Sequence, residues 1–305
     1  MLIQPLAFQT AGPLSVLQFA TSDQDSFAYV PADIAIGKGM VEVRETSDAG
    51  SVNALIVLNA SDTFIFLMDG DILAGAKQNR VLNTSVLLAP HSKTVIPVSC
   101  VEQGRWHAVS PNFTFTDYTA PSHLRKTKSE NVSSSLNESK QFDANQGEVW
   151  NAVRSYSESR KVESPTMSFS DVYEAKRRET EQAVAAVTID PHANGVMFFL
   201  EKKILHADHF TAREVFAHYL PKLLKGVAME YYGIEPSHDP LTQAQAAYDG
   251  VEFLDGWAAV KKDQHPAAGL GTEQRAVNEH YAGMQLAYNE HIIHCSVFSA
   301  PAMGK

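Results

Sequence analysis

The stretch that decides the fold class is ALIVLNASDTFIFLM, residues Ala54–Met68. It holds two short runs of β-branched, aromatic and other apolar residues, Ala54–Leu58 and Thr63–Met68, joined by polar residues that are typical of a turn. Two more runs of this kind follow at Val81–Leu88 and Thr94–Val98. Short strands at this spacing predict an antiparallel, sandwich-like β region over residues 1–120.

Polar and helical patterns replace these strands after residue 120. Ser129–Lys140 is polar and rich in serine, which predicts an exposed mobile loop. Apolar residues at helical spacing predict one helix over Gly147–Ser159 and another from Ser170 to Val187. We therefore expect residues 121–187 to form a Ser-rich loop and a helical connector.

Residues 188–305 combine both kinds of element. The pattern predicts a hairpin that turns at Glu201–Lys203, a helix opened by a capping box at Thr211 and kinked or interrupted at Pro221, and a second hairpin near the end. A further helix is expected over Thr242–Val260. The predicted fold class is α+β, and the pattern leaves open whether this region and the first share one sheet and form one compact unit.

The composition limits the classes of function. The chain has 305 residues, of which 44% are hydrophobic, and its net charge is −10. An acidic chain repels the phosphate backbone at long range, so we expect no nucleic-acid partner. No apolar run approaches the ~20 residues that a membrane span needs, and no signal peptide is apparent. With only two cysteines, the expected location is the cytoplasm.

The most polar part of the β region is residues 69–106. Its four basic residues outnumber its three acidic ones, in contrast to the acidic chain as a whole, and such a focus suits an anionic ligand. The candidate ligand-binding residues are Lys77, Gln78, Asn79, Arg80, Asn83, Arg105 and Trp106. Asp71 and Glu102 are the candidate general base and acid.

Asp69 and Asp71 allow more than one interpretation. If the strand that starts at Thr63 continued, both carboxylates would share one face with Ile65 and Leu67. Such a pair can serve acid–base chemistry or hold a hard metal ion. It can equally form ion pairs with arginines at the margin of the sheet, so the structural and the functional interpretation both stay open.

The cysteines and histidines give weaker signals. Cys100 shares a mostly apolar strand face with Ile96 and Val98, so we interpret it as a small buried residue and not as a nucleophile. His206 and Asp208 share a strand face, but their spacing does not make a metal site by itself. We expect hydrogen-bonded or exposed histidines, and assign no metal ligands from the sequence.

The stretch GAKQNRVLNTSVLLAPHSKTVIPVSCVEQGRW (Gly75–Trp106) resembles the signature of the ADP-ribosylglycohydrolase- and rhodanese-phosphatase-associated protein domain, a bacterial family. SPTMSFSDVYEA (Ser164–Ala175), GVMFFLEKKILHADHF (Gly195–Phe210) and HIIHCSVF (His291–Phe298) fit as well, so the resemblance covers most of the chain. The family often has glutamate where Asp71 stands. The family's name implies a neighbourhood of ADP-ribose hydrolysis and phosphate removal, and the resemblance implies no catalytic residues.

Three hypotheses follow. The first is a site, enzymatic or sensing, for an ADP-ribose-like, NAD-derived or phosphorylated small molecule, in which Lys77, Arg80 and Arg105 hold phosphate while Gln78, Asn79 and Asn83 hydrogen-bond ribose or base. The second is a non-catalytic scaffold protein whose polar segment is structural. The third is a metal-dependent hydrolase that uses Asp69, Asp71 and distant histidines. The sequence identifies no cofactor and no oligomeric state.

Overall fold

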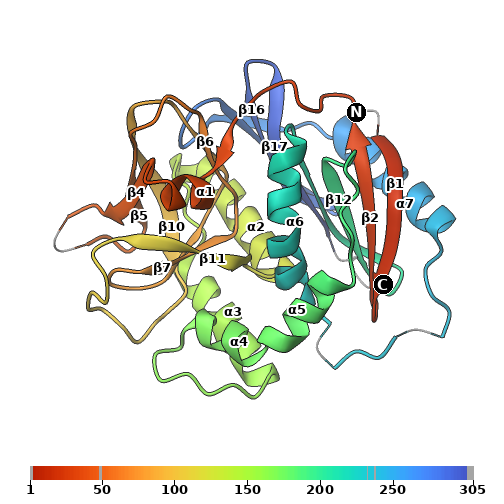
Figure 1. The fold of residues 1–305 in the computed structure, drawn as a ribbon, viewed down its shortest axis with the longest axis horizontal. Helices are drawn as coiled ribbons and strands as arrows, with labels where there is room; N and C mark the ends of the chain where they lie inside the picture. Colours follow the sequence, from red (N-terminus) through yellow and green to blue (C-terminus); the bar gives the residue numbers. More distant parts are fainter. Residues whose placement is uncertain (1–2, 48–49, 232, 237, 301–305) are drawn as a thin grey trace. The chain divides into compact units, whose positions relative to one another are not determined.

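The computed structural model describes residues 3–47, 50–231, 233–236 and 238–300, and it confirms the α+β fold class (Figure 1). The chain divides into two compact units. Unit 1 comprises Met1–Ala28, Arg178–Gln264 and Thr272–Lys305, and unit 2 comprises Tyr29–Arg177 and His265–Gly271. The three-segment organisation expected from composition stays a prediction.

An eight-stranded sheet dominates unit 1, in the order β1-β2-β12-β13-β17-β16-β15-β14. Its strands come from both ends of the chain: β1 and β2 of the first β region share this sheet with the last β region, and Leu17 of β2, for example, pairs with Met197 of β12. The strands are β1 (Ile3–Ala11), β2 (Leu14–Thr21), β12 (Gly195–Leu200), β13 (Lys203–Phe210), β14 (Asp263–Pro266), β15 (Thr272–Val277), β16 (Tyr281–Tyr288) and β17 (His291–Ser299).

Two helices pack on this sheet. Helix α6 (Arg213–Ala228) lies against β12 and β13, and helix α7 (Gln243–Ala259) lies against β1 and β2. The start of α7 is fixed by Thr242, whose side chain accepts a hydrogen bond from the Gln245 N–H at 3.2 Å. This confirms the helix predicted over Thr242–Val260. Trp257 of α7 is buried in a cluster with Cys295 and Val297 of β17.

Helix α6 differs from the prediction at two points. It runs unbroken through Pro221, because the burial of Tyr219, Leu220 and Leu223 on the same helix offsets the one backbone hydrogen bond that proline cannot make. Its N-cap is Ala212 and makes no side-chain cap. The hydroxyl of Thr211, which was expected to cap the helix, donates to the Ile292 carbonyl instead.

Unit 2 contains a six-stranded and a three-stranded sheet, in the orders β11-β7-β8-β10-β5-β4 and β3-β6-β9. The edge strands β4 and β11 of the larger sheet also approach each other, so that sheet is strongly curved. Apolar side chains of both sheets, among them Leu55, Leu67 and Val98, form one core. The strands are β3 (Val30–Pro31), β4 (Val41–Glu45), β5 (Ala54–Asn59), β6 (Ile65–Leu67), β7 (Asp71–Gly75), β8 (Arg80–Leu82), β9 (Val86–Leu88), β10 (Ser92–Cys100) and β11 (Phe113–Thr119).

The strand predicted over Val81–Leu88 is in fact two strands in different sheets, β8 and β9. The residues between them, Asn83–Ser85, are buried and polar. The Ser85 hydroxyl accepts a hydrogen bond from the Asp69 N–H at 2.8 Å. Because side-chain partners here replace a strand partner, the chain can leave one sheet and enter the other.

The helices that complete the chain are α1 (Ala32–Gly37), α2 (Ser122–Ser139), α3 (Gln146–Ser159), α4 (Phe169–Ala175) and α5 (Arg177–Ala185). Helix α3 confirms the helix predicted over Gly147–Ser159. The helix predicted from Ser170 to Val187 is two helices, α4 and α5, which meet at Lys176.

The loop predicted over Ser129–Lys140 is wrong, because most of this stretch is the second half of α2. Leu124, Lys128, Val132 and Leu136 are all buried, and their spacing of four residues is that of one helix face. The serines that suggested a loop are carried on this helix.

Candidate functional site

Most of the candidate residues in segment 69–106 are buried within unit 2. Lys77 is half-buried, and Trp106 exposes 46% of its surface. The buried members of the set are Asp71, Gln78, Asn79, Arg80, Asn83, Glu102 and Arg105. Burial requires that these groups find partners inside the protein, so their hydrogen bonds decide what they can do.

Glu102 and Arg105 form a bidentate ion pair. Arg105 Nε lies 2.9 Å from Glu102 Oε1 and one terminal nitrogen lies 2.6 Å from Oε2. The other terminal nitrogen donates to the Ala76 carbonyl at 2.6 Å and to the His107 carbonyl at 3.2 Å. The N–H groups of Arg105 are thus engaged by the protein, which fixes the turn around Ala76.

Glu102 also receives hydrogen bonds from the Asn79 N–H at 3.2 Å and the Thr166 hydroxyl at 2.9 Å. Burial by itself would raise the pKa of this carboxyl, but the hydrogen bonds from Arg105, Asn79 and Thr166 outweigh it and lower the pKa. The charged form is therefore favoured, which suits an ion pair and opposes a role as a proton donor near neutral pH.

Asp69 is the centre of a second buried ionic cluster, whose cations come from α2. Lys128 Nζ lies 2.8 Å from Asp69 Oδ1, and Arg125 Nε lies 3.4 Å from Oδ2. Gly70 makes the close approach possible, since a Cβ there would lie 2.8 Å from Arg125 Cδ and its φ is +85°. The cluster ties the first half of α2 to the curved sheet.

Asp71 does not share a continuous strand face with Asp69, because the chain turns at Gly70 between β6 and β7. Its Oδ2 accepts the Met68 N–H at 2.9 Å, across that turn. Asp71 is fully buried. The assumption of one uninterrupted strand from Thr63 was therefore wrong.

Arg80 lies beneath Trp106, with its guanidinium carbon 5.6 Å from the centre of the ring system. Lys77 Nζ lies 5.8 Å from the same ring centre. Arg80 also lies 3.7 Å from Glu45 and pairs in register with Cys100 of β10. Burial raises the pKa of the Cys100 thiol to about 11, so it is a neutral buried side chain, as predicted.

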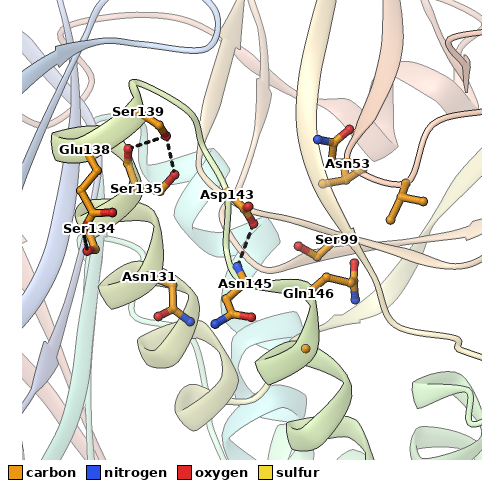
Figure 2. Close-up of a pocket in the computed structure, with 13 residues that line it drawn as sticks. Asn53, Ser99, Asn131, Ser134, Ser135, Glu138, Ser139, Asp143, Asn145 and Gln146 are labelled. Atoms are coloured by element: carbon orange, nitrogen blue, oxygen red, sulfur yellow. Dashed lines mark hydrogen bonds between the residues drawn. The ribbon is translucent and has the colours of Figure 1, made fainter.

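A polar cavity of about 800 Å³ lies in unit 2 beside this buried segment (Figure 2). One side is formed by the second half of α2, and the other by Asn53, Ser99 and Gln146, with Asp143 and Asn145 between them. Its lining residues are Val52, Asn53, Val98, Ser99, Asn131, Ser134, Ser135, Glu138, Ser139, Asp143, Asn145, Gln146 and Gly147. Such a lining offers many hydroxyl, amide and carboxylate groups to one ligand.

Internal hydrogen bonds fix several of these side chains. Gln146 bonds to both backbone groups of Cys100, accepting from its N–H at 2.7 Å and donating to its carbonyl at 2.8 Å. The Ser134 hydroxyl donates to Glu138 at 2.9 Å, and the Asn145 N–H donates to Asp143 at 2.9 Å. The first turn of α3 is thereby held at the end of β10, and the cavity wall is pre-formed.

A second cavity of about 400 Å³ adjoins the first, since Asn53, Ser139 and Asp143 line both. Its wall is more apolar, and Val95 there exposes 56% of its surface. The remaining lining residues are Ala54, Ile96, Pro97, Lys140, Gln141, Phe142 and Ala268.

The residues predicted from the sequence stand behind these cavities; among the described residues, none of the predicted set lines them. Asn83 comes nearest. Its side-chain oxygen accepts a hydrogen bond from Ser99 at 2.9 Å, and its nitrogen donates to the Phe142 carbonyl at 2.9 Å. Asn83 is therefore placed to position a wall residue of each cavity.

The serines of α2 and the amides around α3, which line the cavity, are not among the residues predicted from the sequence. The signal that could have found them is the helical spacing of Leu124, Lys128, Val132 and Leu136, which places Ser135 and Ser139 four residues apart on another face. Without that spacing, the same serines predict a loop.

A buried histidine cluster lies in unit 1, on β13 and β17. His294 Nε2 lies 3.2 Å from one oxygen of Asp208, and His206 Nε2 lies 3.1 Å from the other. This confirms that His206 and Asp208 share a strand face. On the opposite face, burial lowers the pKa of His209 to about 3, so that ring is neutral. Within the described residues, no three His, Cys, Asp or Glu side chains are grouped so as to hold a metal ion.

A profile of the ARPP-1 family, the ARG and Rhodanese-Phosphatase-superfamily-associated Protein domain, matches residues 3–298. Searches of curated proteins and of solved structures gave no match. In the part of the chain that is described, the helices are too short or too polar to cross a membrane. Because the match spans nearly the whole sequence, the chain belongs to the ARPP-1 family.

Proposed function

From this membership, we propose that the chain binds or processes an ADP-ribose-like, NAD-derived or related phosphorylated small molecule, and that a sugar of this ligand occupies the 800 Å³ cavity. The association that the family name states, with ARG and rhodanese-phosphatase proteins, supports the class of ligand. The polar lining of the cavity supports the proposal that a sugar binds there.

The observation that carries the proposal is the chemistry of the cavity wall. Sugar hydroxyls both donate and accept hydrogen bonds, and serine, asparagine and glutamine side chains do the same. The wall gathers such side chains from α2, β10 and α3, where Ser99, Ser135 and Gln146 are examples. Its volume falls within the range of about 300–1,000 Å³ that is usual for small-molecule sites.

The charges of the wall orient the ligand. Glu138 and Asp143 are acidic, and no lysine or arginine is among the described residues that line this cavity. A phosphate there would be repelled, whereas carboxylates accept hydrogen bonds well from sugar hydroxyls. If the protein also catalyses a reaction on the sugar, these two carboxylates are the acid–base groups in position.

Segment 69–106 then has a supporting role in this proposal. Arg105 and Glu102 fix the turn around Ala76, and Asn83 holds Ser99 and the Phe142 backbone. Lys77 and Trp106 are the more accessible members of the predicted set, and Lys77 Nζ lies 5.8 Å from the centre of the Trp106 ring system.

The proposal is tested by thermal unfolding with ADP-ribose, NAD, AMP, inorganic phosphate, magnesium, manganese and zinc. A ligand at 100 times its dissociation constant stabilises the fold by ~2.7 kcal/mol, which raises the midpoint by several degrees. A Ser135→Tyr variant should place an aromatic ring in part of the cavity, obstruct the sugar and reduce or abolish the shift. Ser155→Tyr, at an exposed position of α3 outside the cavity, is the matched control and should retain it.

The second candidate function is a non-catalytic scaffold, and the burial of the two ionic clusters at Asp69 and Glu102 favours it. The cavity proposal is contradicted if none of these compounds raises the unfolding midpoint. It is also contradicted if the increase persists in the Ser135→Tyr variant. The first outcome would leave the scaffold as the better hypothesis and direct the search to a protein partner.

A further inference from the structure

We infer that the two adjoining cavities bind a single nucleoside moiety, with its ribose in the larger cavity and its own base in the smaller one. This inference rests on the proposed function and specifies it. In an ADP-ribose-like or NAD-derived ligand, the moiety would be one of its nucleoside halves.

The two cavities are contiguous. Asn53, Ser139 and Asp143 belong to the walls of both, so one ligand can extend from one cavity into the other past these side chains. A nucleoside has its sugar and base joined by one covalent bond, and its two rings must therefore occupy neighbouring spaces. The volumes of about 800 and 400 Å³ leave room for a ring system in each.

The walls of the two cavities differ in polarity. The larger cavity is lined by hydroxyl, amide and carboxylate groups, whereas the smaller one adds Val95, Ile96, Pro97 and Phe142. Val95 projects from β10 with 56% of its surface exposed, and it does so within this apolar wall. A base has apolar faces and polar edges. The apolar faces can pack against a wall of this kind.

The smaller cavity also has amide side chains that can hydrogen-bond the polar edge of a base. Asn53 and Gln141 line the smaller cavity, and amide side chains can donate and accept at once, as the edges of bases require. Lys140 lies beside them, at the end of α2 with φ of +59°. The carboxylates Glu138 and Asp143 disfavour a phosphate in the larger cavity, so the 5′ substituent lies outside it.

The test compares the dissociation constants of ribose, the four common ribonucleosides, nicotinamide riboside, AMP and ADP-ribose for the full chain, by calorimetry. At least one nucleoside should bind roughly tenfold or more tightly than ribose, because its base is removed from water against apolar side chains. Adding a 5′-phosphate to that nucleoside should give no comparable gain.

Two variants locate the base. Val95→Glu places a charge in the wall of the smaller cavity and should reduce nucleoside affinity to that of ribose, while ribose binding stays unchanged. Val109→Glu is the matched control, since Val109 is 62% exposed in the same unit and lines neither cavity; it should leave both affinities unchanged.

The outcomes separate this inference from the proposed function. If ribose or ADP-ribose binds and depends on Ser135, but no nucleoside binds more tightly than ribose, the nucleoside inference is wrong and the sugar site stands. The same conclusion follows if Val95→Glu leaves nucleoside binding intact. If no compound binds, the proposed function and the inference are both overturned.

Discussion

Two polar regions of unit 2 differ in how their polar groups are satisfied. In segment 69–106 most of the charged side chains are buried, and several form ion pairs, as Asp69 does with Lys128 and Glu102 does with Arg105. In the cavity wall the polar residues are mostly uncharged and exposed, as Ser134 and Asn145 are, and both of these hydrogen-bond to neighbouring residues of the same wall. A high density of polar residues in the sequence therefore does not by itself indicate which of those residues a ligand could reach.

Helix α2 contributes to both regions. Arg125 and Lys128, in its first half, pair with Asp69, while Ser134, Ser135 and Ser139, in its second half, line the cavity. The buried ion pairs therefore hold in place the helix that carries part of the cavity wall. Loss of the first region should affect the second, whereas loss of the second should leave the first intact.

The largest effect is expected from Asp69→Ala. It leaves Arg125 and Lys128 buried without this carboxylate, and removing one partner of a buried ion pair costs about 3–5 kcal/mol of unfolding free energy. Denaturant unfolding measures the loss. Asp62→Ala, at a side chain that is 97% exposed, is the control and should change the free energy by less than ~0.5 kcal/mol. Equal effects of the two variants would show that the Asp69 cluster is not structural.

A smaller effect is expected from Glu102→Gln, which weakens the bidentate pair with Arg105. Hydrogen bonds to charged groups contribute roughly 1.5–3 kcal/mol, so the variant should lose about this much unfolding free energy near neutral pH.

The pH dependence of this loss has a definite sign. Because the pKa of Glu102 is lowered in the folded state, its contribution is complete above the ordinary value of 4.5 and disappears as pH falls through the lowered folded-state pKa. The difference between wild type and Glu102→Gln should therefore shrink on acidification. A difference that is constant with pH would show that the charge of Glu102 is not involved.

The smallest change in unfolding free energy is expected from substitutions in the cavity wall, and it is an increase, not a loss. Ser134→Ala and Ser135→Ala replace serine by a better helix former within α2, so each should raise the unfolding free energy by up to ~0.5 kcal/mol. The same variants should weaken ligand binding. A clear loss of stability would assign these serines to the structure of α2 and would remove the contrast between the two regions.

The fold class and several elements could be predicted because their signals are local. The apolar run Ala54–Leu58 falls on β5, and Thr242 caps α7 where expected. The division of Val81–Leu88 into two strands depends on the partners of Asn83 and Ser85 elsewhere in the chain, so the local pattern could not show it. Ser129–Lys140 misled for a related reason, since serine favours loops unless packing holds it in a helix.

The sequence located the concentration of polar residues but could not show which of them were already paired. Asp69 finds its cations in Arg125 and Lys128, which lie in a segment with no visible link to it in the sequence. The cavity is likewise assembled from Asn53, Ser99, Asp143 and the end of α2, which are separated along the chain. Membership of the ARPP-1 family could be recognised from the sequence, because a long motif does not depend on the fold.

The pairing of β2 with β12 has a consequence for biosynthesis. Leu17 cannot pair with Met197 until the ribosome has synthesised the residues between them. At ~5–20 residues per second this takes roughly 10–40 s. During this interval most of unit 2, from Tyr29 to Arg177, has already been made, while the β1–β2 hairpin has an unpaired edge on β2. An exposed strand edge of this kind invites association with other chains. During synthesis, a chaperone that covers the edge of β2 would therefore protect the hairpin from such association.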